Sequence, residues 1–309
     1  MNTLSGHLDD YLRLRRQLGF KLRVAGILLR NFVRFAEQKR ASFITTKLAL
    51  RWATQPTNIK PVQKANRLGT VRRFAEYLSA VDPRTEIPAQ GLLPYQFRRR
   101  EPHHYRNEDI LRLMEAARRI DPTNELKGVT YATLFGLLAV TGMRIGEALA
   151  LDLVDVDLNQ ALLTVRRAKG NKSRLVPLHV STRQELQRYA DIRDKIFARP
   201  LSPSFFVSER GTRLLDCTVN RWFLLVACQL GLRRPGDRRG PRVHDLRHHF
   251  AIQTLLRWYR TETDAEVHLP ELATYLGHVH VRDTYWYLSA TPELLKLATE
   301  RWQRKEDKR

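Results

Sequence analysis

The heptapeptide "HDLRHHF", residues 244–250, places an arginine between histidines at the spacing of one helical turn. His244, Arg247 and His248 stand at positions i, i+3 and i+4, which share one face of an α-helix. A guanidinium offers a planar set of donors that matches phosphate oxygens, and imidazole can transfer protons near neutral pH. Two histidines can also bind a metal ion, but no nearby carboxylate or cysteine pattern supports that use. The stretch therefore predicts a helix face with phosphate chemistry and no metal site.

A second arginine stands upstream in "TGMRIGEALAL", residues 141–151. Arg144 and Glu147 lie one turn apart, directly after the apolar stretch 128–142, which predicts a buried central helix. An arginine next to a buried helix is costly unless it is paired. An ordinary Arg–Glu ion pair explains the same two residues, so this motif alone does not predict a function.

The segment "QALLTVRRAKGNKSRLVPLH", residues 160–179, predicts two short strands around a Gly170-Asn171 turn. Lys169 and Lys172 stand at the tip of this hairpin. An ammonium group there could donate to DNA or act as an acid. A polar turn with solvated lysines is the plainer interpretation of the local pattern.

The segment "TYLGHVHVRDTYWYLSA", residues 274–290, contains two tyrosines close together, either of which could be a reactive residue. Gly277 predicts the end of a short helix, which leaves His278 at the turn. The next helix, predicted over 280–288, carries Tyr285 and Tyr287 on different faces. Chemistry at one phenol and simple packing of both are open at this point.

The chain has 309 residues, 43% of them hydrophobic, which is enough for a well-buried core and predicts two domains. The formal net charge is +22, with acidic residues interspersed, so we expect a folded protein with basic faces and a nucleic-acid partner. We find no apolar run of membrane-spanning length and no signal peptide, which predicts a cytoplasmic, nucleoid-associated protein. Cys217 and Cys228 suggest neither a disulfide framework nor a zinc site.

Domain boundaries follow from the distribution of prolines and helical patterns. We predict an N-terminal helical DNA-binding domain over 1–82, a basic proline-containing linker over 83–104, and a C-terminal domain over 105–309 that is mainly helical with the hairpin. Basic residues on these segments are candidate DNA contacts, although a solvated basic face explains them equally well. The candidates are Arg67, Arg72, Arg73, Arg98, Arg99, Arg100, Lys172 and Arg174.

Taken in order, these motifs resemble the tyrosine recombinases, the phage-integrase and Xer-like family. The stretches "AKGNKSRLVPL", "HDLRH" and "LGH" are similar to sequence motifs of that family, and the resemblance covers essentially the whole chain. It implies a helical core-binding (SAM-like) domain followed by an α+β catalytic domain. It also implies that the catalytic residues are Arg144, Lys169, His244, Arg247, His278 and the nucleophile Tyr287. Glu147 and His248 would support them.

The resemblance decides between the two tyrosines. The family places its nucleophile nine residues after the histidine of the "LGH" motif, which is Tyr287. Tyr285 and Trp286 are then expected to be packing residues. The acidic stretch within 257–270 is longer than usual for the family, and the residues after Tyr287 resemble recombinases of mobile elements more than chromosome-resolving ones.

The activity implied is site-specific DNA recombination through a 3′-phosphotyrosyl intermediate, without metal, ATP or other cofactor. The implied partners are double-stranded DNA with specific sites and further copies of the chain, as a tetramer on DNA, with related recombinases as possible partners and no membrane. A type IB topoisomerase with the same chemistry is one alternative. A non-catalytic DNA-binding accessory protein of the same fold is the other.

Overall fold

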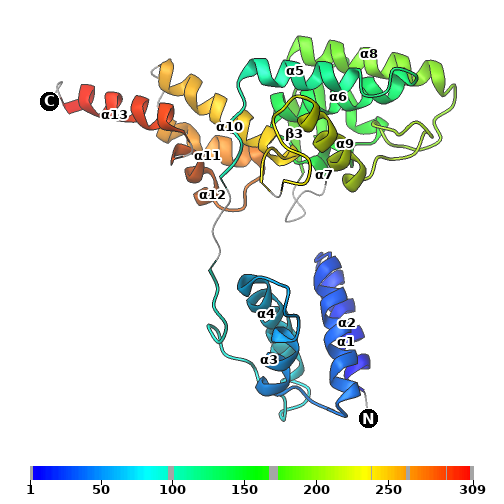
Figure 1. Cartoon of the computed structure of the whole chain (residues 1–309), viewed down its shortest axis with the longest axis vertical. Helices are drawn as coiled ribbons and strands as arrows, with labels where there is room; N and C mark the ends of the chain where they lie inside the picture. The colour runs from blue at the N-terminus through cyan, green and yellow to red at the C-terminus, as the bar shows by residue number, and fades with distance from the viewer. Residues whose placement is uncertain are drawn as a thin grey trace. The chain divides into compact units, whose positions relative to one another are not determined.

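The computed structural model describes residues 3–96, 101–166, 173–237, 239–261, 265–289 and 291–306. The chain divides into two compact units, Met1–Arg100 and Glu101–Arg309 (Figure 1). Both units are mainly helical, and a small three-stranded sheet lies in the second, so the predicted fold class is confirmed. No helix within these described ranges is both long and apolar enough to cross a membrane.

The first unit is a four-helix arrangement around its own apolar core. The helices are α1 (Leu4–Gln17), α2 (Arg23–Gln38), α3 (Thr46–Thr54) and α4 (Pro61–Leu78). Leu68, Val71, Phe74 and Leu78 of α4 are all buried, as their spacing predicts. In the sequence, Ile27, Leu28, Phe32 and Phe35 stand at helical spacing, which predicts one apolar face for α2. This is wrong for Ile27, which is 61% exposed, because the buried face of the helix is formed by Leu29, Phe32, Val33 and Ala36.

Two helix ends in the structure agree with the sequence and one differs. Gly19 follows α1 with a positive φ of 87°, and the Thr291 hydroxyl caps α13 (Pro292–Glu306) by accepting from the Leu294 amide. Asparagine is a preferred N-cap residue, so the sequence predicts a cap at Asn107, but Asn107 is the first helical residue of α5 (Asn107–Arg118). Arg106 is the N-cap, and the Asp109 carboxylate accepts its backbone N–H.

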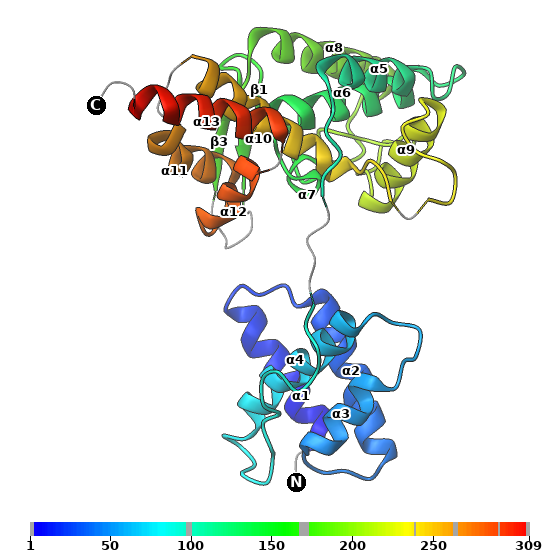
Figure 2. The ribbon, with the colours of Figure 1, turned by 60° about the vertical axis from the view of Figure 1, so that its left-hand side comes forward.

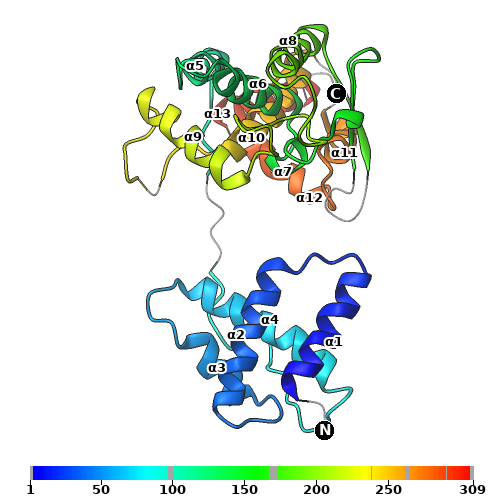
Figure 3. The same ribbon diagram turned by 90° about the vertical axis from the view of Figure 1, so that its right-hand side faces the viewer.

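The core of the second unit surrounds α6 (Glu125–Thr141), which is buried on nearly all sides as its apolar sequence predicts. Figure 3 shows α5, α8 and α10 around it, with α9 beside them. The bounds of these neighbours are α8 (Val180–Ile196), α9 (Asp216–Gln229) and α10 (Val243–Arg260). A long buried helix of this kind gives the loop after it, residues 142–144, a fixed position.

The two predicted strands are present as an antiparallel pair in a sheet of order β1-β2-β3, whose pairs are all antiparallel, and the predicted Gly170-Asn171 turn lies outside the described residues. The strands are β1 (Val156–Asp157), β2 (Leu162–Val165) and β3 (Arg174–Pro177). The short strand β1 follows a 3-10 turn, η1 (Leu153–Asp155). The sequence pattern predicts neither the turn nor this strand. Val165 pairs with Arg174, so Arg174 is the first residue of the returning strand.

The C-terminal elements form a second apolar cluster with the far half of α10. They are α11 (Ala265–Leu276), α12 (Arg282–Tyr285), the 3-10 turn η2 (Trp286–Ser289) and α13. The short helix α7 (Ile145–Ala148) follows α6 instead, and its Ala148 is buried in the core around α6. Figure 2 shows α13 lying across α10 and above α11, and Leu294 of α13 is buried in this cluster. The helix expected over 280–288 is thus a short helix that continues as a 3-10 turn.

Candidate active site

Helix α10 carries the "HDLRH" motif, and its first turn is stabilised by its own sequence. The Asp245 carboxylate accepts the Arg242 backbone N–H at 2.9 Å and pairs with the Arg242 guanidinium at 2.7 Å. An acidic group at this position also complements the positive end of the helix dipole. The helix therefore begins at a fixed residue, and Arg247 is directed into the protein, where its side chain is only 2% exposed.

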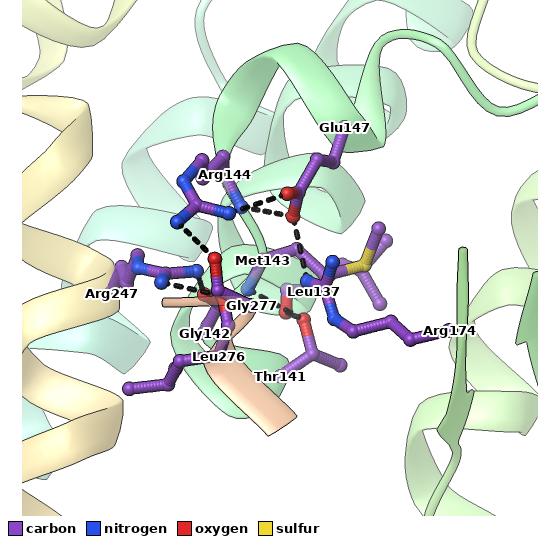
Figure 4. Close-up of polar contacts among 10 residues, drawn as sticks. All are labelled: Leu137, Thr141, Gly142, Met143, Arg144, Glu147, Arg174, Arg247, Leu276 and Gly277. Atoms are coloured by element: carbon purple, nitrogen blue, oxygen red, sulfur yellow. Dashed lines mark hydrogen bonds and ion pairs between the residues drawn. The ribbon is translucent and has the colours of Figure 1, made fainter. Parts of the chain in front are cut away.

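Arg247 joins the C-terminal ends of two other helices (Figure 4). Its Nη1 donates to the carbonyl of Gly142, just after α6, at 2.7 Å. Its Nη2 donates to the carbonyl of Leu276, at the end of α11, at 2.7 Å. Helix C-terminal carbonyls lack intrahelical partners and carry partial negative charge, so they suit a guanidinium. Burial, followed by repulsion from Arg144, lowers the pKa of Arg247 to about 10.

Arg144 is the N-cap of α7 and reaches the same turn from the other side. Its Nη2 donates to the Gly277 carbonyl at 2.8 Å, and its Nη1 pairs with Glu147 at 2.8 Å. Gly277 has a φ of +66°, as expected for a residue that ends a helix, and a Cβ atom there would lie 3.3 Å from Nη1 of Arg144. Glycine is therefore needed both for the turn and for the close approach of the guanidinium.

Glu147 is buried and bonds to two arginines at once. Besides Arg144, it accepts from Arg174 Nη2 at 2.7 Å (Figure 4). Burial alone would raise the pKa of Glu147, but the hydrogen bond and charge of Arg174, and then the contacts with Arg144, bring it below its usual range. The carboxylate therefore stays ionised and pairs with both guanidiniums.

Tyr287 lies in a layer of aromatic rings beside these arginines. Its ring is 5.4 Å from that of His248 and 6.2 Å from that of His278, to which it is nearly parallel. The His278 Nδ1 atom is hydrogen-bonded to the Thr284 hydroxyl at 2.8 Å. Tyr287 is only 1% exposed, so in this state its phenol is packed inside the C-terminal cluster.

Tyr285 differs from its expected role. It is 53% exposed, so the prediction that it is a packing residue is wrong. Trp286 does pack, with its ring 5.2 Å from that of His248. The 3-10 geometry after Tyr285 turns Tyr287 inward, and the two tyrosines point to different environments as their spacing predicts.

His244 stands one turn before Arg247 and at the edge of the aromatic layer, 4.9 Å from the His248 ring. Its side chain is exposed to solvent. The protein around it, and then the positive charge of Arg247, lower the pKa of His244 to about 4. The imidazole is therefore neutral at pH 7 and able to accept a proton.

The charges in this site do not balance. Arg144, Arg174 and Arg247 contribute three guanidiniums, and within the described ranges Glu147 is the one carboxylate that forms an ion pair with any of them. Buried cations without counter-charges are costly. Guanidiniums match the oxygens of phosphate through paired N–H donors. The arrangement is therefore suited to bind a phosphate group.

Other sequence-predicted residues lie elsewhere or cannot be placed. Lys169, Lys172, Arg98, Arg99 and Arg100 fall outside the described residues. Arg67, Arg72 and Arg73 belong to the first unit. Arg73 is exposed, and Arg72 pairs with Glu76 at 2.8 Å.

Arg67 and Arg174 are not the free surface cations that were expected. The Arg67 guanidinium lies 3.8 Å from the Trp52 ring centroid and donates to the Trp52 carbonyl. Arg174 sits in the site beside Glu147. Sequence analysis missed this role of Arg174 and the bond from Thr284 to His278. The sequence signal for Arg174 was its position at the start of the strand after the predicted turn. The signal for the bond to His278 was a threonine six residues further along the chain.

The sequence pattern of the Phage integrase family matches residues 104–293. A protein of Sinorhizobium fredii, y4rB, whose name assigns it to the integrases/recombinases, is 47% identical over the whole length of both chains. The tyrosine recombinase XerD of Caulobacter vibrioides is 29% identical over 77% of this chain and 73% of its own. The solved structure of the XerH site-specific recombinase bound to its palindromic difH substrate, a post-cleavage complex, has a TM-score of 0.67. At 19% identity it covers 97% of this chain and 85% of that one.

The family match extends over most of the second unit, and the full-length relative extends it to the first. The arginine, histidine and tyrosine residues of the motifs all lie within the matched segment. The chain belongs to the phage integrase family, as a tyrosine-type site-specific DNA recombinase.

Proposed function

We propose that Tyr287 is the nucleophile that attacks a DNA phosphate. The phenolic oxygen forms a bond to phosphorus, and the bond from phosphorus to the 5′ oxygen breaks, which leaves a 3′-phosphotyrosyl link and a free 5′-hydroxyl. Its position beside His278 and within electrostatic range of Arg247 supports this role. Tyr285, by contrast, is 53% exposed and does not belong to the apolar cluster that encloses Tyr287. Because Tyr287 is packed in the free protein, DNA binding has to release its side chain before attack.

Arg144 and Arg247 hold the nonbridging oxygens of the phosphate in this proposal. The observation that carries it is their convergence on one turn, residues 276–277, directly before His278. Their charge stabilises the phenolate and the negative charge that develops in the transition state. His278 donates a hydrogen bond to the phosphate, with its ring orientation set by Thr284.

Proton transfer completes the step. A free phenol ionises near pH ~10, so a neutral imidazole that accepts its proton is useful, and His244 is neutral at pH 7. A phosphate between the arginines would cancel part of their charge and raise the pKa of His244. Lys169 protonates the leaving 5′ oxygen. Reversal of the same step by the 5′-hydroxyl of another duplex rejoins the strands, so the energy of the phosphodiester is conserved.

The remaining assignments extend this proposal to the DNA. The helical unit over 1–82 grips double-stranded DNA with residues such as Arg72 and Arg73, and the basic linker over 83–104 lies along its backbone. Four copies act in pairs on two sites, at the ends of a mobile element. The protein works in the cytoplasm, at the nucleoid.

The test uses nicked, radiolabelled duplex DNA that carries the ends of the genetic element encoding the protein. Wild type, Tyr287→Phe and the matched variant Tyr285→Phe are compared for a covalent protein–DNA band on a denaturing gel. We expect Tyr287→Phe alone to lose the band, with an unchanged melting temperature. A band retained by Tyr287→Phe and lost by Tyr285→Phe would reverse the assignment of the nucleophile.

The two alternatives give different results in the same setting. An accessory protein would bind the DNA and give no covalent band with any variant. A topoisomerase would relax a supercoiled plasmid that lacks the element's ends, whereas a site-specific recombinase acts on plasmids that contain them.

A further inference from the structure

Arg174 lies in the active site, although a residue that follows a predicted hairpin turn would ordinarily be expected at the surface. It is the first residue of β3, and its backbone is held in the sheet opposite Val165. Its side chain is 14% exposed and pairs with Glu147, whose other oxygen pairs with Arg144. The carboxylate therefore bridges an arginine on the sheet and an arginine on α7.

The other donors of Arg174 are enclosed. Its Nε and Nη1 atoms are buried, and they have no hydrogen-bond partner among the described residues. A Cβ atom on Gly277 would lie 3.3 Å from Arg174 Nη1 as well as from Arg144 Nη1, so both guanidiniums approach the same turn. Arg174 also acts electrostatically on Arg247 and on Tyr275, the residue two before Gly277.

Buried donors without hydrogen-bond partners destabilise the folded state, so a chain selected for stability alone would not keep them. The remaining donor, Arg174 Nη2, bonds to Glu147 at 2.7 Å and helps to hold the pKa of that carboxyl below its usual range. The bond to Glu147 fixes where the carboxylate lies, and thereby where it holds Arg144. Without it, Glu147 would have Arg144 as its single ion-pair partner and could draw that guanidinium away from the phosphate.

We propose that Arg174 is a positioning residue for DNA cleavage, which acts through the Glu147 carboxylate to hold the Arg144 guanidinium against the turn at Gly277. The inference rests on the proposed function, because it assigns Arg144 to the scissile phosphate. It also ties the β3 strand to the phosphate-binding arginines, so the sheet and α7 form one unit.

The test measures the rate of covalent adduct formation with the nicked DNA described above, over a range of DNA concentrations. Arg174→Ala is expected to lower the maximal rate by about 10- to 100-fold, the usual effect of losing a residue that orients a reacting group. The half-saturating DNA concentration should change little, since Arg174 is enclosed. Arg174→Lys, which can still pair with Glu147, should recover part of the rate.

Arg118→Ala is the control for loss of an arginine–glutamate pair, because Arg118 pairs with Glu185 at the same distance of 2.7 Å at a more exposed place outside the site. Its rate should equal that of wild type. Melting temperatures report whether each variant folds, and if Arg174→Ala does not fold, Arg174→Lys carries the comparison. A wild-type rate in Arg174→Ala, or a loss explained by weaker DNA binding alone, would overturn the proposal.

A second substrate separates Arg144 from the leaving group. DNA with sulfur in place of the bridging 5′ oxygen expels a thiolate, which needs no proton because thiols ionise near pH ~8.5. The defect of Arg174→Ala should persist on this substrate, since the phosphate oxygens are unchanged. Full recovery would show that Arg174 serves protonation of the leaving group, and would overturn the role through Arg144. If wild type forms no adduct with either substrate, the proposed function itself fails.

Discussion

Replacing Gly277 by alanine should separate the strain of a turn from the placement of two arginines. Gly277 has a φ of +66°, and an L-residue in this region costs about 1–2 kcal/mol. The new Cβ atom would also lie 3.3 Å from the Nη1 atoms of both Arg144 and Arg174. Both guanidiniums are bonded to Glu147, so neither can retreat without disturbing that carboxylate.

Gly231→Ala provides the matched control. Gly231 also follows a helix, its φ is +70°, and a Cβ atom there would meet nothing within 4 Å. The two variants therefore share the backbone cost and differ in the crowding of the arginines. At about 2–4 °C per kcal/mol for a domain of this size, each should lower the melting temperature by roughly 2–8 °C.

The rate of covalent adduct formation on nicked DNA should distinguish them. We expect Gly277→Ala to lose about 10- to 100-fold in rate, because a small displacement of a phosphate-binding group is enough for that effect. Gly231→Ala should remain close to wild type. Equal rates in the two variants would refute the reasoning, since the crowding at Gly277 would then have no consequence for the site.

Three further predictions address the residues around this turn. Thr284→Val removes the bond to the His278 ring and should slow adduct formation about 10-fold, whereas Thr284→Ser should keep most of the rate. The pKa of His244 is about 4, below its ordinary value of ~6.5. As the pH falls between these two values, the unfolded state binds a proton that the folded state does not, so the free energy of unfolding decreases. Urea unfolding at pH 7 and pH 5 should therefore show a smaller loss of stability on acidification in His244→Asn than in wild type; an equal loss would contradict the lowered pKa. Arg247→Gln should abolish the adduct while lowering the free energy of unfolding by about 1–3 kcal/mol, as buried carbonyls lose donors, and urea unfolding with the adduct gel checks both.

Local features of the fold were predictable because they depend on residues close together in the chain. The apolar run of α6, the hairpin, the stop at Gly277 and the cap at Thr291 each follow from a few neighbouring residues. The ordered motifs were likewise sufficient to indicate the family. The exposed Ile27 shows the limit of periodicity, since one residue of phase decides whether a side chain is buried. The exposed Tyr285 shows the limit of the resemblance, which identifies motif residues but does not give the burial of their neighbours.

The sequence by itself determined which helices form, where several of them end, and which residues carry the family motifs. Only the tertiary structure decided how Arg144 meets the Gly277 carbonyl, 133 residues away, and how Arg174 meets Glu147, 27 residues away. Such contacts depend on how α7, β3 and α11 pack together, and many residue patterns are compatible with each helix or strand alone. The buried arginines are held by carbonyls at helix ends, which every helix possesses, so side-chain identity does not reveal which helix end each arginine will reach.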